Sequence, residues 1–243
     1  MKTIPRPSIP DCESCPNREF SDICGIVPPT EEPFGLIKRR AMYQPGQQVF
    51  YEGHVALGLY ILCQGKVKLT RLNRKGQQRL VDILDSGQLL EKQAFQEQPI
   101  HQVTCEVLET SQVCLLDRTT FLSFLKEHGE LAVKLVQVLS KEMTNVVNSA
   151  DQFAFTPARD RLARLLWELS ERFGEQTSEG SRIMLTLKRE DLAQMAAVTV
   201  ETVVRLLRDF QESGLVLMQG RELTIVKPDR LQKISSTSTS SVD

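Results

Sequence analysis

Three cysteines lie close together near the start of the sequence, and their thiols are spaced closely enough to act together on a metal or in a redox reaction. Cys12, Cys15 and Cys24 fall within the stretch DCESCPNREFSDIC. This stretch is polar and proline-rich, so it has too few apolar residues to bury three thiols in a core. Clustered thiolates bind zinc and iron–sulfur clusters, and they also exchange with disulfides. We therefore expect a metal centre or a redox reaction at these sulfurs.

The composition restricts the class of protein and its compartment. Of 243 residues, 41% are hydrophobic and 25% are charged, which is typical of a globular chain of one or two domains. No apolar run approaches the roughly 18 residues of a membrane span, and the leader lacks the apolar stretch of a secretory signal. We expect a cytoplasmic protein with no membrane partner, in which six cysteines favour metal or redox roles. The three histidines share no metal-ligand spacing and are expected in loops or on the surface: His54, His101 and His128.

Residues 1–33 are expected to form a flexible leader, and regular secondary structure is expected to begin after it. Short apolar runs broken by glycine fill residues 34–118, among them GLYILCQGKVKLTRL, QRLVDIL and SQVCLLD. Several strands at this spacing predict an all-β barrel or jelly roll. Cys63 and Cys105 lie in apolar strands and are expected to be buried small hydrophobic residues.

Residues 119–156 switch to helical spacing and are expected to form a long helix and a linker. Apolar residues recur at steps of four and three, the 3.5-residue period of a coiled-coil seam: Ala132, Val136, Leu139, Met143, Val146 and Ala150. This pattern predicts a dimer interface. The alternative is one helix that packs only on the core of its own chain, and Leu131 and Leu135 are placed to pack in that way.

A second small domain is expected over residues 157–235, followed by a disordered tail over residues 236–243. It begins with an amphipathic helix, PARDRLARLLWELSERFG, then a polar loop, EQTSEGS, and a short strand, IMLTL. Two helices are predicted next, Lys188–Ala196 and Val200–Gln211, with a tight turn between them and Thr199 as N-cap of the second. The run LVLMQGRELTIV then predicts a hairpin.

The second of these helices has the side chains that a DNA-recognition helix needs. Its exposed face is expected to present Glu201, Val204, Arg205 and Arg208. Arginine can contact guanine with two hydrogen bonds, and glutamate can accept one from cytosine. Four basic residues can neutralise flanking phosphates: Lys188, Arg189, Arg208 and Arg221. The alternative is an ordinary helical hairpin with a solvated, charged face. The sequence offers no nucleophile with a histidine positioned to activate it, so we do not expect an enzyme.

The stretch TVETVVRLLRDFQESGLV resembles the recognition-helix segment of the Crp/Fnr superfamily of bacterial regulators, with its E-T-V-x-R core on Glu201–Arg205. PGQQVFYEG, the run at Tyr60–Leu69 and LETSQVCLLD resemble the β-roll of that family, so the resemblance covers about residues 34–235. It implies an α+β fold with a cyclic-nucleotide-binding-like β-roll (jelly roll), a long dimerisation helix and a C-terminal winged helix-turn-helix. It also implies a homodimer that reads palindromic double-stranded DNA through Glu201 and Arg205 and contacts RNA polymerase.

Two features of the β-roll bear on the effector that this resemblance implies. Family members that bind cAMP hold the nucleotide with a Gly-Glu pair and an Arg-Ser pair. Here the corresponding positions are Glu91-Lys92 and Gln102-Val103. A phosphate pocket without its arginine binds a cyclic nucleotide poorly, so we expect no cAMP.

The cysteines instead resemble those of the FNR branch, whose oxygen sensors hold a [4Fe–4S] cluster with three N-terminal cysteines and one in the β-roll. The match places these ligands at Cys12, Cys15, Cys24 and Cys114. The Cys15-x8-Cys24 separation is longer than is usual in that branch, and position 204 carries Val where FNR has Ser. The hypothesis is a transcription regulator controlled by an oxygen- or redox-sensitive cluster.

Other uses of the thiols stay open at this point. A structural zinc ion would take the same four sulfurs. A reversible disulfide, for instance between Cys24 and Cys114, would suit a redox switch in a regulator that has no cluster or uses another effector.

Overall fold

The computed structural model describes most of the chain beyond its leader. The described residues are 17–19, 21, 23–26, 38–73, 76, 78–220 and 222–236; of residues 142 and 145–155 only the backbone is described. They divide into two compact units, one up to Glu142 and one from Met143 onward that also takes in Arg79–Val81. None of the helices in the described ranges is long and apolar enough to cross a membrane.

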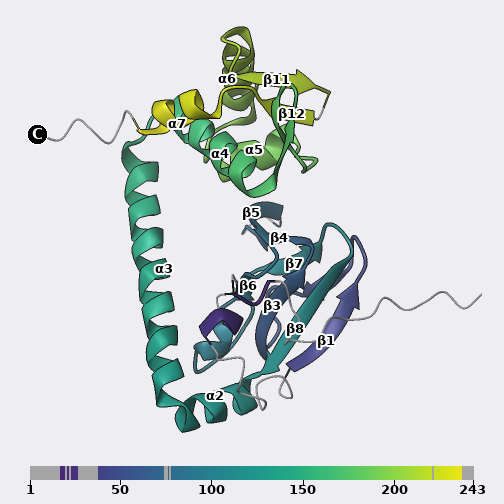
Figure 1. The fold of residues 1–243 in the computed structure, drawn as a ribbon, viewed down its shortest axis with the longest axis vertical. Helices are drawn as coiled ribbons and strands as arrows, with labels where there is room; N and C mark the ends of the chain where they lie inside the picture. The colour runs from purple at the N-terminus through teal and green to yellow at the C-terminus, as the bar shows by residue number, and fades with distance from the viewer. Residues whose placement is uncertain are drawn as a thin grey trace, which may run out of the picture. The chain divides into compact units, whose positions relative to one another are not determined.

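The described strands of the first unit form two four-stranded sheets (Figure 1), with the orders β1-β8-β3-β6 and β2-β7-β4-β5. In chain order the strands are β1 (Lys38–Tyr43), β2 (Gln48–Phe50), β3 (Gly58–Gln64), β4 (Lys66–Leu72), β5 (Gln78–Asp85), β6 (Leu89–Glu91), β7 (Thr104–Val107) and β8 (Ser111–Asp117). Side chains alternate between the two faces of a strand. Tyr60 and Leu62 of β3 accordingly join a core that draws on both sheets, whereas Leu59 and Ile61 join a second cluster on the other face.

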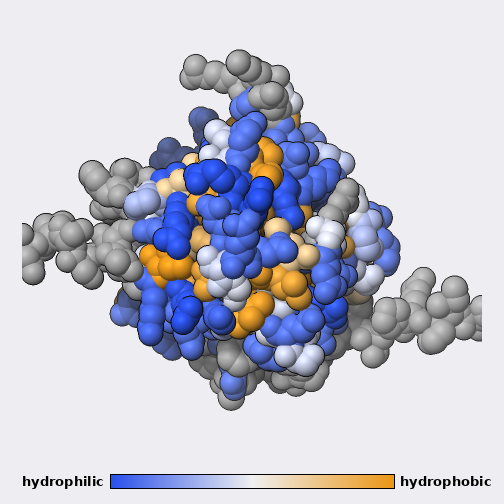
Figure 2. All heavy atoms as spheres, turned by 90° about the horizontal axis from the view of Figure 1, so that it is seen from above, coloured by the Kyte–Doolittle hydropathy of each residue, from blue (hydrophilic) through white to orange (hydrophobic). Residues whose placement is uncertain are grey.

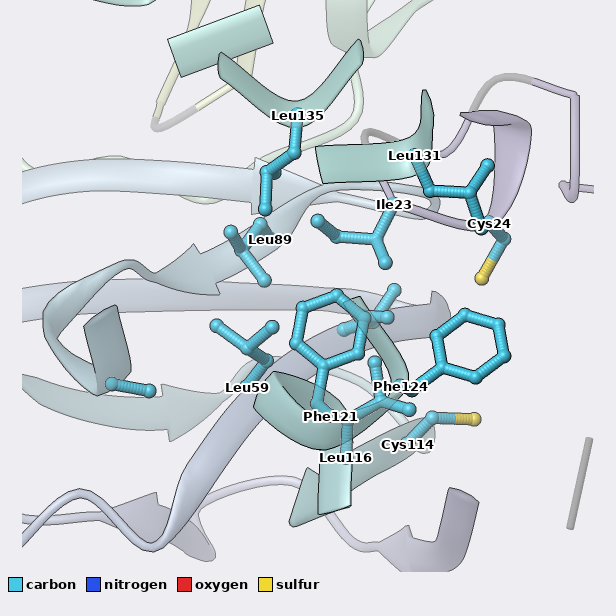
Figure 3. Close-up of a cluster of buried hydrophobic side chains, with 12 residues drawn as sticks. Ile23, Cys24, Leu59, Leu89, Cys114, Leu116, Phe121, Phe124, Leu131 and Leu135 are labelled. Atoms are coloured by element: carbon cyan, nitrogen blue, oxygen red, sulfur yellow. The ribbon is translucent and has the colours of Figure 1, made fainter. Parts of the chain in front are cut away.

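This second cluster covers the outer face of the β1-β8-β3-β6 sheet (Figure 3). Helix α2 (Arg118–Glu127) contributes Phe121 and Phe124, and helix α3 (Gly129–Phe155) contributes Leu131 and Leu135. The short 3-10 helix η1 (Cys24–Ile26) and the residue before it also pack there. A second 3-10 helix, η2 (Gln93–Phe95), follows β6. The outer-face cluster therefore joins the leader, the sheet and the start of α3.

The helical stretch expected from residue 119 is interrupted at His128. The cap residue has φ −121° and ψ 69°, outside the helical region, so α2 ends at Glu127 and α3 begins at Gly129. Asp117 caps the start of α2 by accepting a hydrogen bond from the Thr120 N–H. The bend lets α2 and the start of α3 both bury apolar residues on one sheet.

The second unit combines helices with a small sheet of the order β11-β12-β10-β9. Its elements are α4 (Ala158–Phe173), β9 (Gly174–Thr177), β10 (Gly180–Ile183), α5 (Arg189–Met195), α6 (Val200–Glu212), β11 (Val216–Gln219), β12 (Glu222–Ile225) and α7 (Pro228–Ser236). The expected β11–β12 hairpin is confirmed, with Gly220 at φ +63° in its turn. The expected loop EQTSEGS and strand IMLTL are wrong, because β9 and β10 form a hairpin there and strand structure ends at Ile183. The residues of this hairpin are polar and gave no strand pattern. Pairing of β10 with β12 stabilises it.

Candidate DNA-binding helix and thiol site

The helix-turn-helix is built around a backbone turn in an unusual conformation. Helix α5 ends at Met195 and α6 begins at Val200. Between them Ala197 has φ +52°, the left-handed region that non-glycine residues rarely adopt. The Arg161 guanidinium of α4 donates hydrogen bonds to the carbonyls of Thr156, Ala196 and Ala197, at 2.6, 2.9 and 3.0 Å. Arg161 therefore holds the turn that sets α6 against α5.

Helix α6 presents the side chains expected on its exposed face. Its buried face consists of Val203, Leu206, Leu207 and Phe210. Glu201, Arg205 and Arg208 are exposed, and Val204 is 52% exposed. Hydrophilic residues cover most of the surface seen in Figure 2, and hydrophobic residues form separate patches on it. An exposed valine on a charged helix face can contact a thymine methyl group.

Two intrahelical ion pairs orient the arginines of α6. Arg205 lies 3.6 Å from the Asp209 carboxylate, and Arg208 lies 2.8 Å from the Glu212 carboxylate, both one turn further along the helix. Exposed pairs of this kind are weak, because solvent screens the two charges. A bidentate contact to guanine discriminates by about 1–3 kcal/mol. These ion pairs can therefore orient both arginines in the free protein and still break when the arginines contact DNA.

The start of α6 is capped by Thr199, as predicted, because its hydroxyl accepts a hydrogen bond from the Thr202 N–H at 3.2 Å. Hydrogen bonds from the Glu201 N–H and from Thr199 lower the pKa of the exposed Glu201 carboxyl, so it stays ionised. Lys188 is exposed before α5. Arg189 is half-buried and donates to the Met218 sulfur at 3.3 Å, so its guanidinium lies against β11.

The seam predicted on α3 is described only in part. Val136 and Met143 are 60% and 71% exposed, Ala132 is half-buried, and Leu139 packs partly on the outer-face cluster. The side chains of Val146 and Ala150 lie outside the described residues. Val133, which the seam pattern left out, is also exposed. Within the described part, α3 therefore keeps one face on its own sheet and leaves apolar residues exposed on another.

Two of the four predicted sulfur ligands belong to one buried group. Cys24 of η1 and Cys114 of β8 are both in the outer-face cluster, and Cys114 is 2% exposed (Figure 3). Cys114 thus faces away from the core between the sheets and toward the leader. The buried Lys38 ammonium donates a hydrogen bond to the Cys24 sulfur at 3.1 Å. Cys12 and Cys15 lie outside the described residues.

Cys63 differs from its expected role as a buried hydrophobic residue. It is half-buried at the edge of the outer-face cluster, and the structure pairs its sulfur with that of Cys114 as a disulfide, with the Cα atoms 6.4 Å apart. The disulfide suggested between Cys24 and Cys114 is absent from the described residues, since Cys24 is a free thiol. Cys105 is free and fully buried in the core between the sheets, where burial raises its pKa strongly. Of the cysteines expected to be core residues, only Cys105 is one.

His101 lies in a loop, one of the two settings expected for it, but it is buried there and only 1% exposed. Its ring stacks on Phe50 with 3.9 Å between the ring centres, and its Nδ1 lies 2.5 Å from the Glu91 carboxylate. Glu91 also accepts a hydrogen bond from the Gln102 N–H at 2.6 Å. The loop before β7 is drawn inward by backbone hydrogen bonds between His101 and residues 53 and 54. The Glu91 carboxylate is therefore engaged by His101 and by the main-chain N–H of Gln102, the first residue of the pair that corresponds to Arg-Ser.

A [4Fe–4S] cluster needs four thiolate ligands as a rule. Cys24 and Cys114 offer the right donor atoms within one buried cluster. Among the described residues, however, no group of three or more Cys, His, Asp or Glu side chains is arranged to hold a metal ion. The described part of the chain therefore fits half of the ligand set.

Comparison with known proteins agrees with this two-unit architecture. The model of the cyclic nucleotide-binding domain matches residues 40–128, and that of the Crp-like helix-turn-helix domain matches residues 160–234. The CRP-like cAMP-activated global transcriptional regulator of Mycobacterium tuberculosis is 28% identical over 208 residues, which are 83% of this chain and 92% of that protein. The fumarate and nitrate reduction regulatory protein of Escherichia coli is 27% identical over 200 residues, 82% of this chain and 80% of that protein.

The fold is shared with solved structures as well. FixK2 from Bradyrhizobium japonicum superposes with a TM-score of 0.67 at 20% identity, over 82% of this chain and 97% of that one. Because the two domain models match in the same order and the relatives align along most of the chain, this protein belongs to the Crp/Fnr superfamily.

Proposed function

We propose that this Crp/Fnr-type DNA-binding transcription regulator reads palindromic DNA as a homodimer under the control of an oxygen- or redox-sensitive iron–sulfur cluster. The ligands would be Cys12, Cys15, Cys24 and Cys114. Contact with RNA polymerase and a cytoplasmic location are parts of the same proposal that rest on family resemblance. The observation that carries the proposal is the gathering of Cys24 and Cys114 in one buried cluster on the outer face of the sheet.

The proposed DNA contacts follow from the exposed face of α6. Glu201 and Arg205 would read base edges, Val204 would contact a thymine methyl, and Arg208 with Lys188 would contact phosphates. Arg189 would join them only after leaving the Met218 sulfur. A dimer would present two such helices to successive major grooves of a palindrome.

The proposed assignments of Arg205 and Arg208 can be separated by one pair of variants. A palindrome is first selected from a random duplex library with the wild-type protein. Arg205→Ala should lose about 1–3 kcal/mol of preference for that palindrome over scrambled DNA. Arg208→Ala should weaken binding to both sequences and reduce the salt slope by about one. Equal losses of sequence preference in both variants would count against Arg205 as a base reader.

The proposed cluster would be held where the leader meets the sheet. The cluster would supply iron that reacts with oxygen or nitric oxide, and this reaction would dismantle the cluster. The chain would provide the anionic sulfur ligands. The Lys38 ammonium donates a hydrogen bond to the Cys24 sulfur, which fixes the position of this ligand. Two of the ligands, Cys12 and Cys15, lie outside the described residues, and the C-x2-C spacing lets both reach one centre.

A change at this site has a direct route to the dimer helix. Leu131 and Leu135 of α3 pack in the same cluster as Cys24 and Cys114. Residues of a shared, closely packed cluster cannot shift independently. Release of the leader would therefore alter the packing of the start of α3 and bias the geometry of the dimer.

The β-roll interior supports a regulator that does not use cAMP. Glu91 is occupied by His101 and by the Gln102 N–H, and no arginine stands at the position of the Arg-Ser pair. A cyclic phosphate would have to displace these contacts and would find no guanidinium partner.

Iron and sulfide analysis with visible spectra, after anaerobic purification, tests the cluster. We expect iron, sulfide and the visible absorbance of an iron–sulfur cluster in the wild type and in Cys105→Ser. Cys24→Ser and Cys114→Ser should lose all three.

The alternative function is a cluster-free regulator that works by a thiol switch, favoured by the contact between Cys63 and Cys114. Absence of iron and sulfide from wild-type protein would decide for that alternative.

A further inference from the structure

The pairing of β3 with β8 places a second cysteine beside the proposed cluster ligand of the β-roll. Ile61 lies opposite Cys114, Leu62 opposite Val113 and Gln64 opposite Gln112. The register shifts between Leu62 and Gln64, so Cys63 is the extra residue of a bulge. Cys63 packs against the outer-face cluster that contains Cys114, so both cysteines lie on this side of the sheet.

The geometry of the pair permits a covalent bond without a change in the backbone. The Cα atoms are 6.4 Å apart, inside the range of roughly 4.4–6.8 Å that disulfides require. The two sulfur atoms are in contact. Asn17 of the leader donates a hydrogen bond to the Cys63 carbonyl at 2.7 Å, so the leader docks beside this pair.

We propose that Cys63 is the redox partner of Cys114, and that in cluster-free protein the two form a disulfide that withholds Cys114 from iron. The role of Cys114 as a ligand rests on the proposed function, whereas the disulfide itself does not. Cys63 is half-buried and Cys114 is almost fully buried, so the reaction enters through Cys63.

The chemistry needs a low-molecular-weight disulfide as oxidant. The Cys63 thiolate attacks this disulfide, forms a mixed disulfide and releases one thiolate of the oxidant. The Cys114 thiolate then attacks the Cys63 sulfur, forms the internal disulfide and releases the second thiolate. Two cysteine thiols are oxidised, the external disulfide is reduced to two thiols, and the two protons pass to the released thiolates.

Neither other thiol described in the structure is as well placed to react. Cys24 is buried, so an oxidant reaches it less easily than it reaches the half-buried Cys63. Cys105 is fully buried in the core between the sheets, and burial raises its pKa, which keeps it protonated. Cys105 is therefore the matched control for Cys63.

The test uses full-length, iron-free protein treated with oxidised glutathione, after which free thiols are alkylated. Trypsin with a Glu-specific protease places Cys63 in residues 53–66 and Cys114 in residues 110–118, apart from Cys105. We expect these two peptides joined by a disulfide in the wild type and in Cys105→Ser, and not in Cys63→Ser or Cys63→Ala. Circular dichroism checks that the variants are folded.

Full alkylation of both peptides in the wild type would overturn the proposal, as would a link from Cys114 to the Cys24 peptide. A second arm adds iron and sulfide anaerobically to oxidised and to reduced protein. Oxidised wild type should take up iron only after dithiothreitol is added, whereas Cys63→Ser should need no reductant. Equal uptake by oxidised and reduced wild type would refute the withholding of Cys114. If no sample takes up iron, the cluster proposal fails while the disulfide result stands.

Discussion

Replacing Arg161 by methionine should destabilise the second unit and weaken DNA binding together. The guanidinium donates three hydrogen bonds to main-chain carbonyls, and those to Thr156 and Ala196 are partly buried. A hydrogen bond from a charged group contributes about 1.5–3 kcal/mol when buried. Taking these two at the low end for partial solvation, and neglecting the exposed bond to Ala197, the loss is about 2–3 kcal/mol.

The sole tryptophan of the chain, Trp167, lies in α4 and makes the second unit visible by fluorescence. For a unit of this size, about 2–3 kcal/mol corresponds to a fall in melting temperature of roughly 10–20 °C. Affinity for DNA should fall as well, because the turn that sets α6 against α5 loses its anchor. Methionine retains the apolar stem of the arginine, so the comparison isolates the hydrogen bonds.

Arg164→Met is the matched control on the same helix. Arg164 pairs with Glu168 one turn along, and both side chains are about 40% exposed. Such a pair contributes about 0.3–0.5 kcal/mol, so this variant should melt close to the wild type. Equal melting temperatures for the Arg161 and Arg164 variants would refute the argument that the guanidinium holds the turn.

Three further substitutions test other parts of the structure. Ala197→Val puts a β-branched residue at positive φ and should cost about 1–2 kcal/mol, whereas Ala197→Gly should not destabilise, both measured by urea unfolding. Asp117→Ala removes the cap of α2 and should cost about 1 kcal/mol at neutral pH. Its hydrogen bonds to Thr120 lower the pKa of Asp117, so this stability is present above its ordinary value of 3.8. The gap between wild type and variant should narrow as the pH falls through the lowered pKa; a constant gap would contradict this. Val136→Glu should weaken the dimer, measured by sedimentation velocity, without unfolding the chain. Lys134 is exposed outside the seam, so Lys134→Glu should leave the dimer intact. Equal weakening of the dimer by both variants would count against the seam.

Local patterns in the sequence determined the helix-turn-helix and most of the strands. Two helices with a turn near residue 197 follow from the spacing of Leu192, Val203 and Leu206 and from the cap at Thr199, since these signals act within a few residues. The β11–β12 hairpin follows from a glycine in its turn. The same local reasoning missed β9 and β10, because their pairing partners, and not their own polar residues, make them strands.

The surroundings of each thiol and of each buried charge come from packing between elements that are distant in the chain. Cys63 meets Cys114 because β3 pairs with β8 in a register set by a bulge, and no pattern inside either strand encodes that register. His101 is buried because its loop is drawn toward Phe50 and Glu91 by contacts distant in sequence. Arg161 reaches the turn at Ala197 across 36 residues of chain. Residue types and local patterns were enough to name the candidate chemistry and the elements that carry it. Which residues meet depends on how those elements pack, because long-range contacts follow from how whole faces fit together.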